Sequence, residues 1–444
     1  MRIALAMWPA PAHLYPFAPL AWALRAAGHD VYVVSHPCFA DAVVGEGLPF
    51  ASVCDGSVPA PVGPGGVYTA ERAEVARVSQ ALDLSDADRV TWNTFSQFFL
   101  VSMWDFTPYR GSAADPLPVM DGMVRFFRDW RPDLVIWDPC LPGAAIAARA
   151  CGARHARLSG PDVVGWSIDT FERLVSGPDA PELPHPMVET LRAMGERYDV
   201  PVDHETLFGQ WTVNPMPPAL NLPGYDRLRT VPMRWLPHAK QDATPDWLYP
   251  VPSRPRIALS LGVSTRAFLG GDWSYVPVLL EALGGLDVEV VATLNDVQMA
   301  DVSTVPDNVR VVDYLPLNQL GPTCSAVVHH GGLASMAAAA ALRLPQLIVD
   351  FLDRPVVAET SEDGVVSATR YALAPITGAY VTHHGAGEVV DLSKAGVEDV
   401  RAQVCRVLGE PSFREGADQL LADQLASPNP SDVVPVLERL ARAA

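Results

Sequence analysis

The sequence predicts an α/β protein made of two similar halves, each a parallel sheet lying between layers of helices. Short apolar runs such as Ile3–Met7, His29–Val34 and Asp133–Asp138 alternate with helical stretches. The alternation stops across Pro215–Pro255, where proline is dense, and it restarts at Arg256. Alternation of this kind is typical of parallel strands that are buried on both faces, so each half is expected to form one sheet.

The first half supplies its elements in the order that such a sheet needs. The segment "PFAPLAWALRAAG" has helical spacing, begins with a proline and meets a stop signal at Gly28. "MVRFFRDW" and "GAAIAARACG" predict two more helices, and "RHARL" predicts a strand. Residues 55–115 are richer in polar and irregular sequence, which favours loops and helices attached to this half.

The second half repeats the pattern. It holds the predicted strands "RIALSLG", "VEVVATL", "VRVVDYL", "SAVVHH" and "PQLIVDF", a helix in "YVPVLLEALGGL" and an alanine-rich helix. "GVEDVRAQVCRVLG" and "PSDVVPVLERLARAA" predict helices that close the chain. Ligands of such folds bind at the carboxyl ends of the strands, so we expect the site in a cleft between the two halves.

Composition and charge argue against several classes of partner. The 444 residues carry a formal net charge of −19, and an acidic surface repels the phosphates of nucleic acids and anionic membranes. No stretch approaches the roughly 18 apolar residues of a membrane span, and no signal-peptide core forms. The six cysteines are far apart and include no C-x-x-C pair, which argues against a zinc site and a disulfide framework and predicts a cytoplasmic protein.

The stretch "VVHHGGLASM" (Val327–Met336) predicts an anion site. An apolar strand ends in two histidines and two glycines, and a helix follows at once, so its free N–H groups and positive dipole end face a ligand. Neither a G-x-x-x-x-G-K-[ST] loop nor a G-x-G-x-x-G loop occurs. A shared metal is not expected, because adjacent side chains at a strand end point in opposite directions. The plain alternative is a histidine that merely ends a strand. A second motif, "THHGAG" (Thr382–Gly387), is interpreted as a loop.

These motifs resemble those of the family-one nucleotide-sugar glycosyltransferases. "HHGGLAS" followed by "LPQLIV" is similar to their donor signature, H-H-G-G-x-G-T and then G-V-P-Q. "WRPDLVIWDP", "CGARHARLSGPD" and "VPMRWLPH" are similar to the actinobacterial enzymes that put deoxysugars on macrolides and anthracyclines. The resemblance implies the GT-B fold, with an acceptor domain (1–225), a proline-rich linker (226–255), a donor domain (256–427) and a helix that crosses back (428–444).

The resemblance also implies roles for single residues. His13, expected in the loop after the first strand, matches the general base, and Asp138 matches the carboxylate that orients it. A neutral imidazole there can take a proton from an acceptor hydroxyl near pH 7. His329 matches the histidine that contacts the donor phosphates. The donor-binding set is Ser264, Thr265, Tyr314, Leu315, His329, Gly331, Gly332, Leu333, Ala334, Ser335, Asp353 and Arg354.

Two departures from the family pattern concern the donor. Ala334-Ser335 stands where the family has G-T, and the alanine narrows the approach to phosphate. Asp353-Arg354 replaces the acidic-plus-amide pair that reads sugar hydroxyls, and the arginine adds a charge. Unusual donor choice or weakened activity is therefore expected.

The expected reaction is inverting transfer of a deoxysugar from a thymidine-diphosphate donor to a hydrophobic polyketide-type aglycone, without metal or cofactor. Two alternatives stay open, a catalytically silent GT-B binding or scaffold protein and a nucleotide-sugar epimerase of the same fold. "DLSDADRVTWNTF" is similar to a segment of relatives that need a helper protein resembling a haem monooxygenase without haem. We therefore expect such a partner, and a homodimer or hetero-complex.

Overall fold

The computed structural model describes residues 1–176, 183–223, 228–268 and 271–442. It divides into two compact units. Unit 1 comprises Met1–Leu236 and Ser427–Ala444, and unit 2 comprises Pro237–Ala426. The stretch 226–255, expected as a linker, is thus shared between them, and Asp246–Leu248 forms a single 3-10 turn within it.

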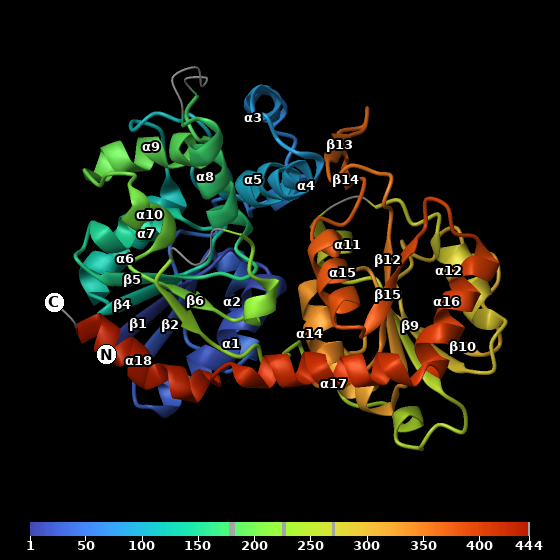
Figure 1. The fold of residues 1–444 in the computed structure, drawn as a ribbon. Helices are drawn as coiled ribbons and strands as arrows, with labels where there is room; N and C mark the ends of the chain where they lie inside the picture. The colour runs from blue at the N-terminus through green and yellow to red at the C-terminus, as the bar shows by residue number, and fades with distance from the viewer. Residues whose placement is uncertain (177–182, 224–227, 269–270, 443–444) are drawn as a thin grey trace. The chain divides into compact units, whose positions relative to one another are not determined.

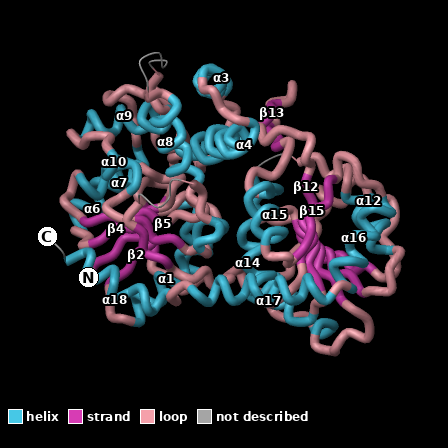
Figure 2. The backbone as a smooth tube through the Cα atoms, in the orientation of Figure 1, coloured by secondary structure: helices cyan, strands magenta, loops and turns pink. Residues whose placement is uncertain are grey.

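Unit 1 is a seven-stranded parallel sheet with the strand order β3-β2-β1-β4-β5-β6-β7. Figures 1 and 2 show helices on both sides of these strands. The strands are β1 (Arg2–Ala6), β2 (Asp30–Ser35), β3 (Phe50–Ser52), β4 (Leu134–Trp137), β5 (Arg154–Leu158), β6 (Thr212–Asn214) and β7 (Thr230–Pro232). The helices are α1 (Pro11–Ala26), α2 (Ala40–Gly45), α3 (Thr69–Ala81), α4 (Asp86–Thr94), α5 (Leu100–Met103), α6 (Pro118–Trp130), α7 (Gly143–Arg149), α8 (Val163–Leu174), α9 (Pro186–Tyr198), α10 (His204–Phe208) and α18 (Pro430–Arg442).

The last helix, α18, packs against α1 in unit 1 (Figure 1). Its apolar residues Val433, Val434 and Leu437 are buried in the same core cluster as Ile3, Leu5 and Leu14. Burial of this face explains why the terminal segment belongs to the first unit although the preceding helix belongs to the second.

Unit 2 is a six-stranded parallel sheet with the strand order β10-β9-β8-β11-β12-β15 and a separate antiparallel hairpin, β13-β14. The strands are β8 (Arg256–Ser260), β9 (Glu289–Thr293), β10 (Val309–Val312), β11 (Ala326–His329), β12 (Gln346–Asp350), β13 (Ala358–Thr360), β14 (Val366–Ala368) and β15 (Gly387–Asp391). The helices are α11 (Ser264–Phe268), α12 (Val276–Gly284), α13 (Leu317–Leu320), α14 (Leu333–Ala341), α15 (Ala374–His383), α16 (Val397–Gly409) and α17 (Pro411–Ala426).

The two parallel sheets confirm the predicted fold class, but three local predictions need correction. Helix α1 begins at Pro11 and not at Pro16, because Pro11 occupies the first helical turn, where a missing N–H costs nothing. The motif at 382–387 is not one loop, since Thr382 and His383 end α15 and Gly387 begins β15. Helix α17, which was not predicted from the sequence, has four buried residues and contacts α14.

Within the described parts of the chain, no helix is long and apolar enough to cross a membrane.

Candidate active site

Two predicted residues of unit 1 meet where its strand order reverses. β1 lies between β2 and β4, so that Ala6 pairs with Val34 on one side and with Trp137 on the other. In an open parallel sheet, ligands bind at such a switch point, just beyond the carboxyl ends of the strands. The chain leaving β1 meets the chain leaving β4 here, because the amide of Trp8 donates to Asp138 Oδ2 at 3.1 Å.

His13 and Asp138 form a hydrogen-bonded pair at this point. The distance from His13 Nδ1 to Asp138 Oδ2 is 2.5 Å. Asp138 is 1% exposed, and its Oδ1 accepts the amide of Cys140 at 2.7 Å, so the carboxylate is fixed from both sides. His13 was expected in a loop, but it lies in the first turn of α1 and keeps 28% of its side-chain surface exposed. An imidazole that donates from Nδ1 carries its lone pair on Nε2, which suits it to accept a proton.

The same place contains a group of three side chains that could bind a metal. Potential ligand atoms of His13, Asp138 and Cys140 lie within 4.8 Å of one another, the single such group among the described residues. Burial raises the pKa of the Cys140 thiol well above its usual value, which disfavours the thiolate that a metal needs. Asp138 already accepts three hydrogen bonds. The donor set therefore suits a base and its orienting carboxylate better than a metal.

In unit 2 the strand order reverses between β8 and β11, where the predicted anion motif lies. Ser260 at the end of β8 pairs with His329 at the end of β11. The His329 imidazole is fully buried and uses both nitrogens. Nδ1 accepts the amide of Gly331 at 3.1 Å, and Nε2 lies 2.9 Å from Gln346 Oε1. Burial lowers its pKa to about 4. In this structure the His329 ring holds the turn at Gly331 by a hydrogen bond. The contact of His329 with the donor phosphates stays a prediction.

The neighbouring His330 faces the other way and was not among the predicted site residues. A Cβ at Gly262 or at Gly332 would lie 2.4 or 2.8 Å from its ring, so both glycines are needed for the close approach. The Tyr371 ring packs against it edge-on, with ring centroids 4.4 Å apart. Burial and the adjacent His329 lower its pKa to about 3. The alternation of side chains at a strand end was the one sequence signal for it.

The start of α14 offers backbone amides to a ligand. No side chain caps this helix, and its first amides, from Leu333 to Ser335, have no carbonyl partner one turn earlier in the helix. Thr377 Oγ1 donates to the Gly331 carbonyl at 2.7 Å and fixes the turn that leads into the helix. Because both histidines are neutral at pH 7, these amides and the helix dipole provide the attraction for an anion.

A partly open cavity of about 60 Å³ adjoins His330 at the carboxyl ends of β8, β11 and β12. Its lining residues are Leu261, Gly271, Asp272, Trp273, Tyr275, His330, Val349, Asp350, Phe351, Arg354, Ala368, Thr369, Arg370 and Tyr371. The predicted Arg354 pairs with Asp272 at 3.2 Å, and its guanidinium lies 4.0 Å from the centroid of the Phe351 ring. Its charge is therefore balanced within the cavity wall. Asp353 lies in the exposed turn just before it.

The remaining predicted donor residues are more scattered. Ser264 is the first residue of α11, after β8, whereas the side chain of Thr265 lies outside those described. The Tyr314 hydroxyl donates to the Lys240 carbonyl at 2.9 Å. Leu315 is 7% exposed and belongs to a core cluster. The donor contact expected of Tyr314 and Leu315 stays a prediction.

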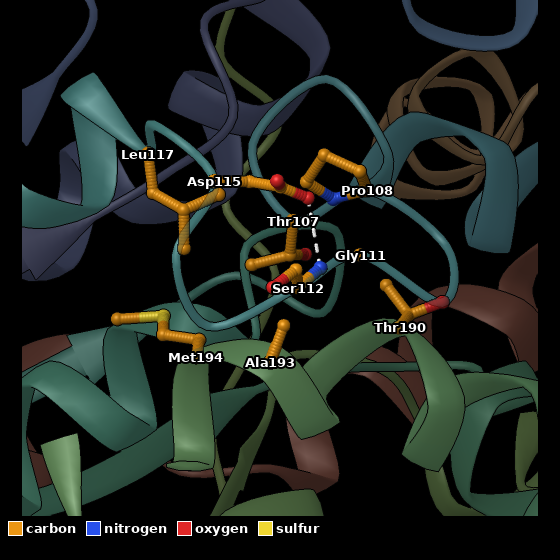
Figure 3. A pocket seen from close by; sticks show the side chains of 9 residues that line it. All are labelled: Thr107, Pro108, Gly111, Ser112, Asp115, Leu117, Thr190, Ala193 and Met194. Carbon is orange, nitrogen blue, oxygen red and sulfur yellow. Dashed lines mark hydrogen bonds between the residues drawn. The ribbon is translucent and has the colours of Figure 1, made fainter. Parts of the chain in front are cut away.

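The structure contains a further small pocket in unit 1, away from the predicted residues. It is a narrow space between the 107–117 loop and α9, and Figure 3 shows Thr190, Ala193 and Met194 of that helix lining one side. The amide of Ser112 donates to Asp115 Oδ2 at 2.8 Å across the loop.

Comparison with known proteins identifies the family. Residues 22–262 match the N-terminal domain, and residues 277–369 the C-terminal domain, of the family described as erythromycin biosynthesis protein CIII-like. The chain belongs to this family. It is 35% identical to 10-deoxymethynolide desosaminyltransferase of Streptomyces venezuelae, over 99% of this chain and 97% of that protein. It is 34% identical to aclacinomycin-T 2-deoxy-L-fucose transferase of Streptomyces galilaeus, over 99% and 96%.

A solved structure supports the same assignment. The glycosyltransferase VinC, crystallised in complex with dTDP, matches with a TM-score of 0.76 and 30% identity over 99% of each chain. The fold is therefore GT-B, and the chain is a nucleotide-sugar-dependent glycosyltransferase of the macrolide and anthracycline type.

Proposed function

We propose that the protein moves a deoxysugar from a thymidine-diphosphate donor to a hydroxyl of a hydrophobic polyketide-type aglycone, with inversion at the anomeric carbon. The observation that carries the proposal is the His13–Asp138 pair at the switch point of unit 1. The names of the two relatives support the classes of substrate, since they pair 10-deoxymethynolide and aclacinomycin T with deoxysugars. The dTDP complex of VinC supports the nucleotide.

His13 acts as the general base in this proposal. Nε2 takes the proton of the acceptor hydroxyl as its oxygen attacks the anomeric carbon and the bond from that carbon to the diphosphate oxygen breaks. The resulting imidazolium is stabilised by Asp138, whose carboxylate is buried and held by two backbone amides. Thymidine diphosphate leaves with the negative charge that develops on its oxygen.

The leaving diphosphate is held at the start of α14 without a metal. Leu333, Ala334 and Ser335 supply amides, and the helix dipole favours the charge that grows as the bond breaks. Ala334 adds one methyl group at an exposed position but leaves each amide in place. The departure from glycine is therefore compatible with an active enzyme.

The helper protein and the oligomeric state remain expectations. The segment that prompted the helper, 83–95, includes α4, and its aromatic residues Trp92 and Phe95 are fully buried. Trp92 stacks on Phe171, with ring centroids 6.2 Å apart. These rings are covered by unit 1 itself, so a helper that binds this segment would contact its exposed residues, such as Asp83 and Asp86. Transfer assays with and without such a protein test this expectation.

A transfer assay with purified protein tests the proposed function. We would combine thymidine-diphosphate deoxysugars with a panel of aglycones, including 10-deoxymethynolide and aclacinomycin T, and follow products by mass spectrometry. Appearance of the glycoside together with free thymidine diphosphate supports the proposal. Nucleotide binding without transfer, with or without a helper, identifies a silent scaffold. A changed sugar nucleotide in the absence of acceptor identifies an epimerase.

A further inference from the structure

Two charged side chains of unit 1 hold the loop 62–68 in place. Asp105 accepts the amides of Val62 at 3.1 Å and of Gly63 at 2.8 Å, and the hydroxyl of Tyr68 at 2.7 Å. The Arg72 guanidinium donates to two backbone carbonyls of the same loop, that of Pro64 at 2.8 Å and that of Gly66 at 3.3 Å. The Asp105 carboxylate thus accepts from N–H groups of the loop, and the Arg72 guanidinium donates to its C=O groups.

Holding the loop in this way carries a desolvation cost. Burial is the main influence on both groups, raising the pKa of Asp105 and lowering that of Arg72. Removing a charge from water is unfavourable unless hydrogen bonds replace the lost hydration. A loop that needed only to cover the core would be stabilised more simply by apolar packing. The charges therefore indicate that this backbone must hold one conformation.

The segment that carries Asp105 is itself held by hydrogen bonds. Asp105 follows α5, and its neighbour Trp104 donates from Nε1 to Thr190 Oγ1 of α9 at 3.2 Å. Two residues further on, the Thr107 hydroxyl donates to the Met103 carbonyl at 3.1 Å. Figure 3 shows Thr107 and Thr190 among the residues that line the small pocket at this contact. The residue that precedes Asp105 is thus hydrogen-bonded to α9.

The loop touches the side chain that adjoins the proposed base. A Cβ at Gly63, whose φ is +58°, would lie 2.8 Å from the Trp8 indole, so backbone and ring are in close contact. Trp8 donates from Nε1 to the Ser102 carbonyl at 3.0 Å, and its ring centroid lies 5.5 Å from that of His13. The loop and the catalytic imidazole are therefore separated by one indole ring.

The loop also exposes apolar surface. Val62 is 50% exposed and Val67 is 47% exposed, although the backbone between them is held by ions. A single exposed valine is ordinary, but two on a preorganised loop beside a catalytic base fit an apolar ligand. A hydrophobic aglycone whose hydroxyl reaches His13 is such a ligand.

We propose that Val62 and Val67 contact the aglycone and that Asp105 and Arg72 are positioning residues that preorganise this wall of the acceptor site. The inference rests on the proposed function and adds residues that determine acceptor specificity. Ordering the loop before binding means that the acceptor does not have to order it, which favours a low KM for the acceptor. Neither nucleotide binding nor the His13–Asp138 pair depends on the two valines.

The test compares steady-state constants of four variants. Val62→Asn with Val67→Asn should raise the acceptor KM on the order of tenfold, through loss of apolar contact, with donor KM and thymidine diphosphate affinity unchanged. Val62→Ile with Val67→Ile should keep or lower the acceptor KM. Asp105→Asn should raise the acceptor KM more than it lowers kcat. Val297→Asn, at a 62% exposed valine of unit 2, is the matched control and should change nothing.

The outcomes separate this inference from the proposed function. If the natural sequence transfers sugar and the Val62→Asn, Val67→Asn protein keeps its acceptor KM within twofold, the inference is overturned and the function stands. The same holds if the double variant loses only activation by a helper protein, since the loop is then a protein interface. A natural sequence that transfers no sugar contradicts the proposed function itself. If the Asp105→Asn protein does not fold, the acceptor KM values of the two valine double variants decide whether the inference stands.

Discussion

Replacing Asp138 with asparagine should impair transfer severely while the protein stays folded. The Asp138 carboxylate accepts three hydrogen bonds, two at Oδ2 from Trp8 and His13 and one at Oδ1 from Cys140. An asparagine amide has one oxygen and one NH₂ group, so it cannot accept on both sides. If its oxygen serves Trp8 and His13, the NH₂ group faces the buried amide of Cys140. If it is flipped, the NH₂ group faces His13 Nδ1 and forces the proton onto Nε2.

Each orientation of the asparagine has an expected cost, one in stability and the other in rate. An unsatisfied buried amide costs about 1–3 kcal/mol of stability. The flipped orientation removes the lone pair that takes the acceptor proton, and loss of a general base costs on the order of 10² to 10⁴ in rate. This corresponds to about 2.7 to 5.4 kcal/mol of activation free energy. The asparagine also lacks the charge that stabilises an imidazolium, so kcat should fall in both orientations.

The assay is steady-state transfer to a hydroxyl acceptor, with thymidine diphosphate affinity and thermal unfolding measured on the same protein. We expect kcat for Asp138→Asn to fall at least 100-fold, with nucleotide affinity unchanged. Asp129→Asn, at an exposed position of α6, is the control and should behave as the natural sequence. A kcat for Asp138→Asn within fivefold of the natural value would refute the orienting role.

Four further predictions concern unit 2. Thymidine diphosphate should bind in excess chelator with the affinity seen in magnesium, because amides at the start of α14 hold it; calorimetry that shows metal-dependent binding contradicts this. Ala334→Gly should bind thymidine diphosphate as well or better. Arg354→Gln should change which sugar is transferred more than nucleotide affinity, as measured on a panel of thymidine-diphosphate sugars; the opposite pattern contradicts the sugar-side placement. Stability to urea should fall as pH drops from 6.5 towards 4, because His329 and His330, with folded pKa values of about 4 and 3, take up protons more readily when unfolded.

The two buried histidines should make the free energy of unfolding depend on pH in one direction only. Well above pH 6.5 both histidines are neutral in the folded and the unfolded state and contribute no pH dependence. Below it the unfolded chain binds more protons, so the free energy of unfolding decreases by up to about 1.4 kcal/mol per pH unit for each histidine. His330→Asn should flatten the slope of urea midpoint against pH. An equal slope in both proteins would show that the ring is not held neutral.

The alternation of apolar runs predicted the two sheets because a strand buried on both faces needs an unbroken apolar sequence. Runs such as "DLVIWD" and "SAVVHH" became β4 and β11 for this reason. The start of α1 was harder to predict, since Pro16 and Pro19 lie within the helix and usually mark its beginning. The apolar residues of helix α17 do not form a clear helical stripe, and its contact with α14 is not visible in the local sequence.

The candidate sites were predicted where the ends of neighbouring strands bring residues together. His13 and Asp138 are 125 residues apart, but each follows a strand and the strands are adjacent. The sequence predicted that the two histidines point in opposite directions, but it did not show which of them is enclosed by the core of unit 2. Asp105 and Arg72 gave no signal in the sequence, since their partners are mainly backbone groups of a loop with no periodic pattern.

The most direct test of the central claim is the rate of transfer by the His13→Ala protein. His13 of unit 1 is the proposed proton acceptor, and the proposed nucleotide contacts lie in unit 2, so a variant of His13 should lose transfer and keep nucleotide binding. We expect His13→Ala to fold, to bind thymidine diphosphate with unchanged affinity and to transfer sugar to a hydroxyl acceptor on the order of 10² to 10⁴ more slowly. Transfer at the natural rate with intact nucleotide binding would contradict the assignment of His13 as the general base.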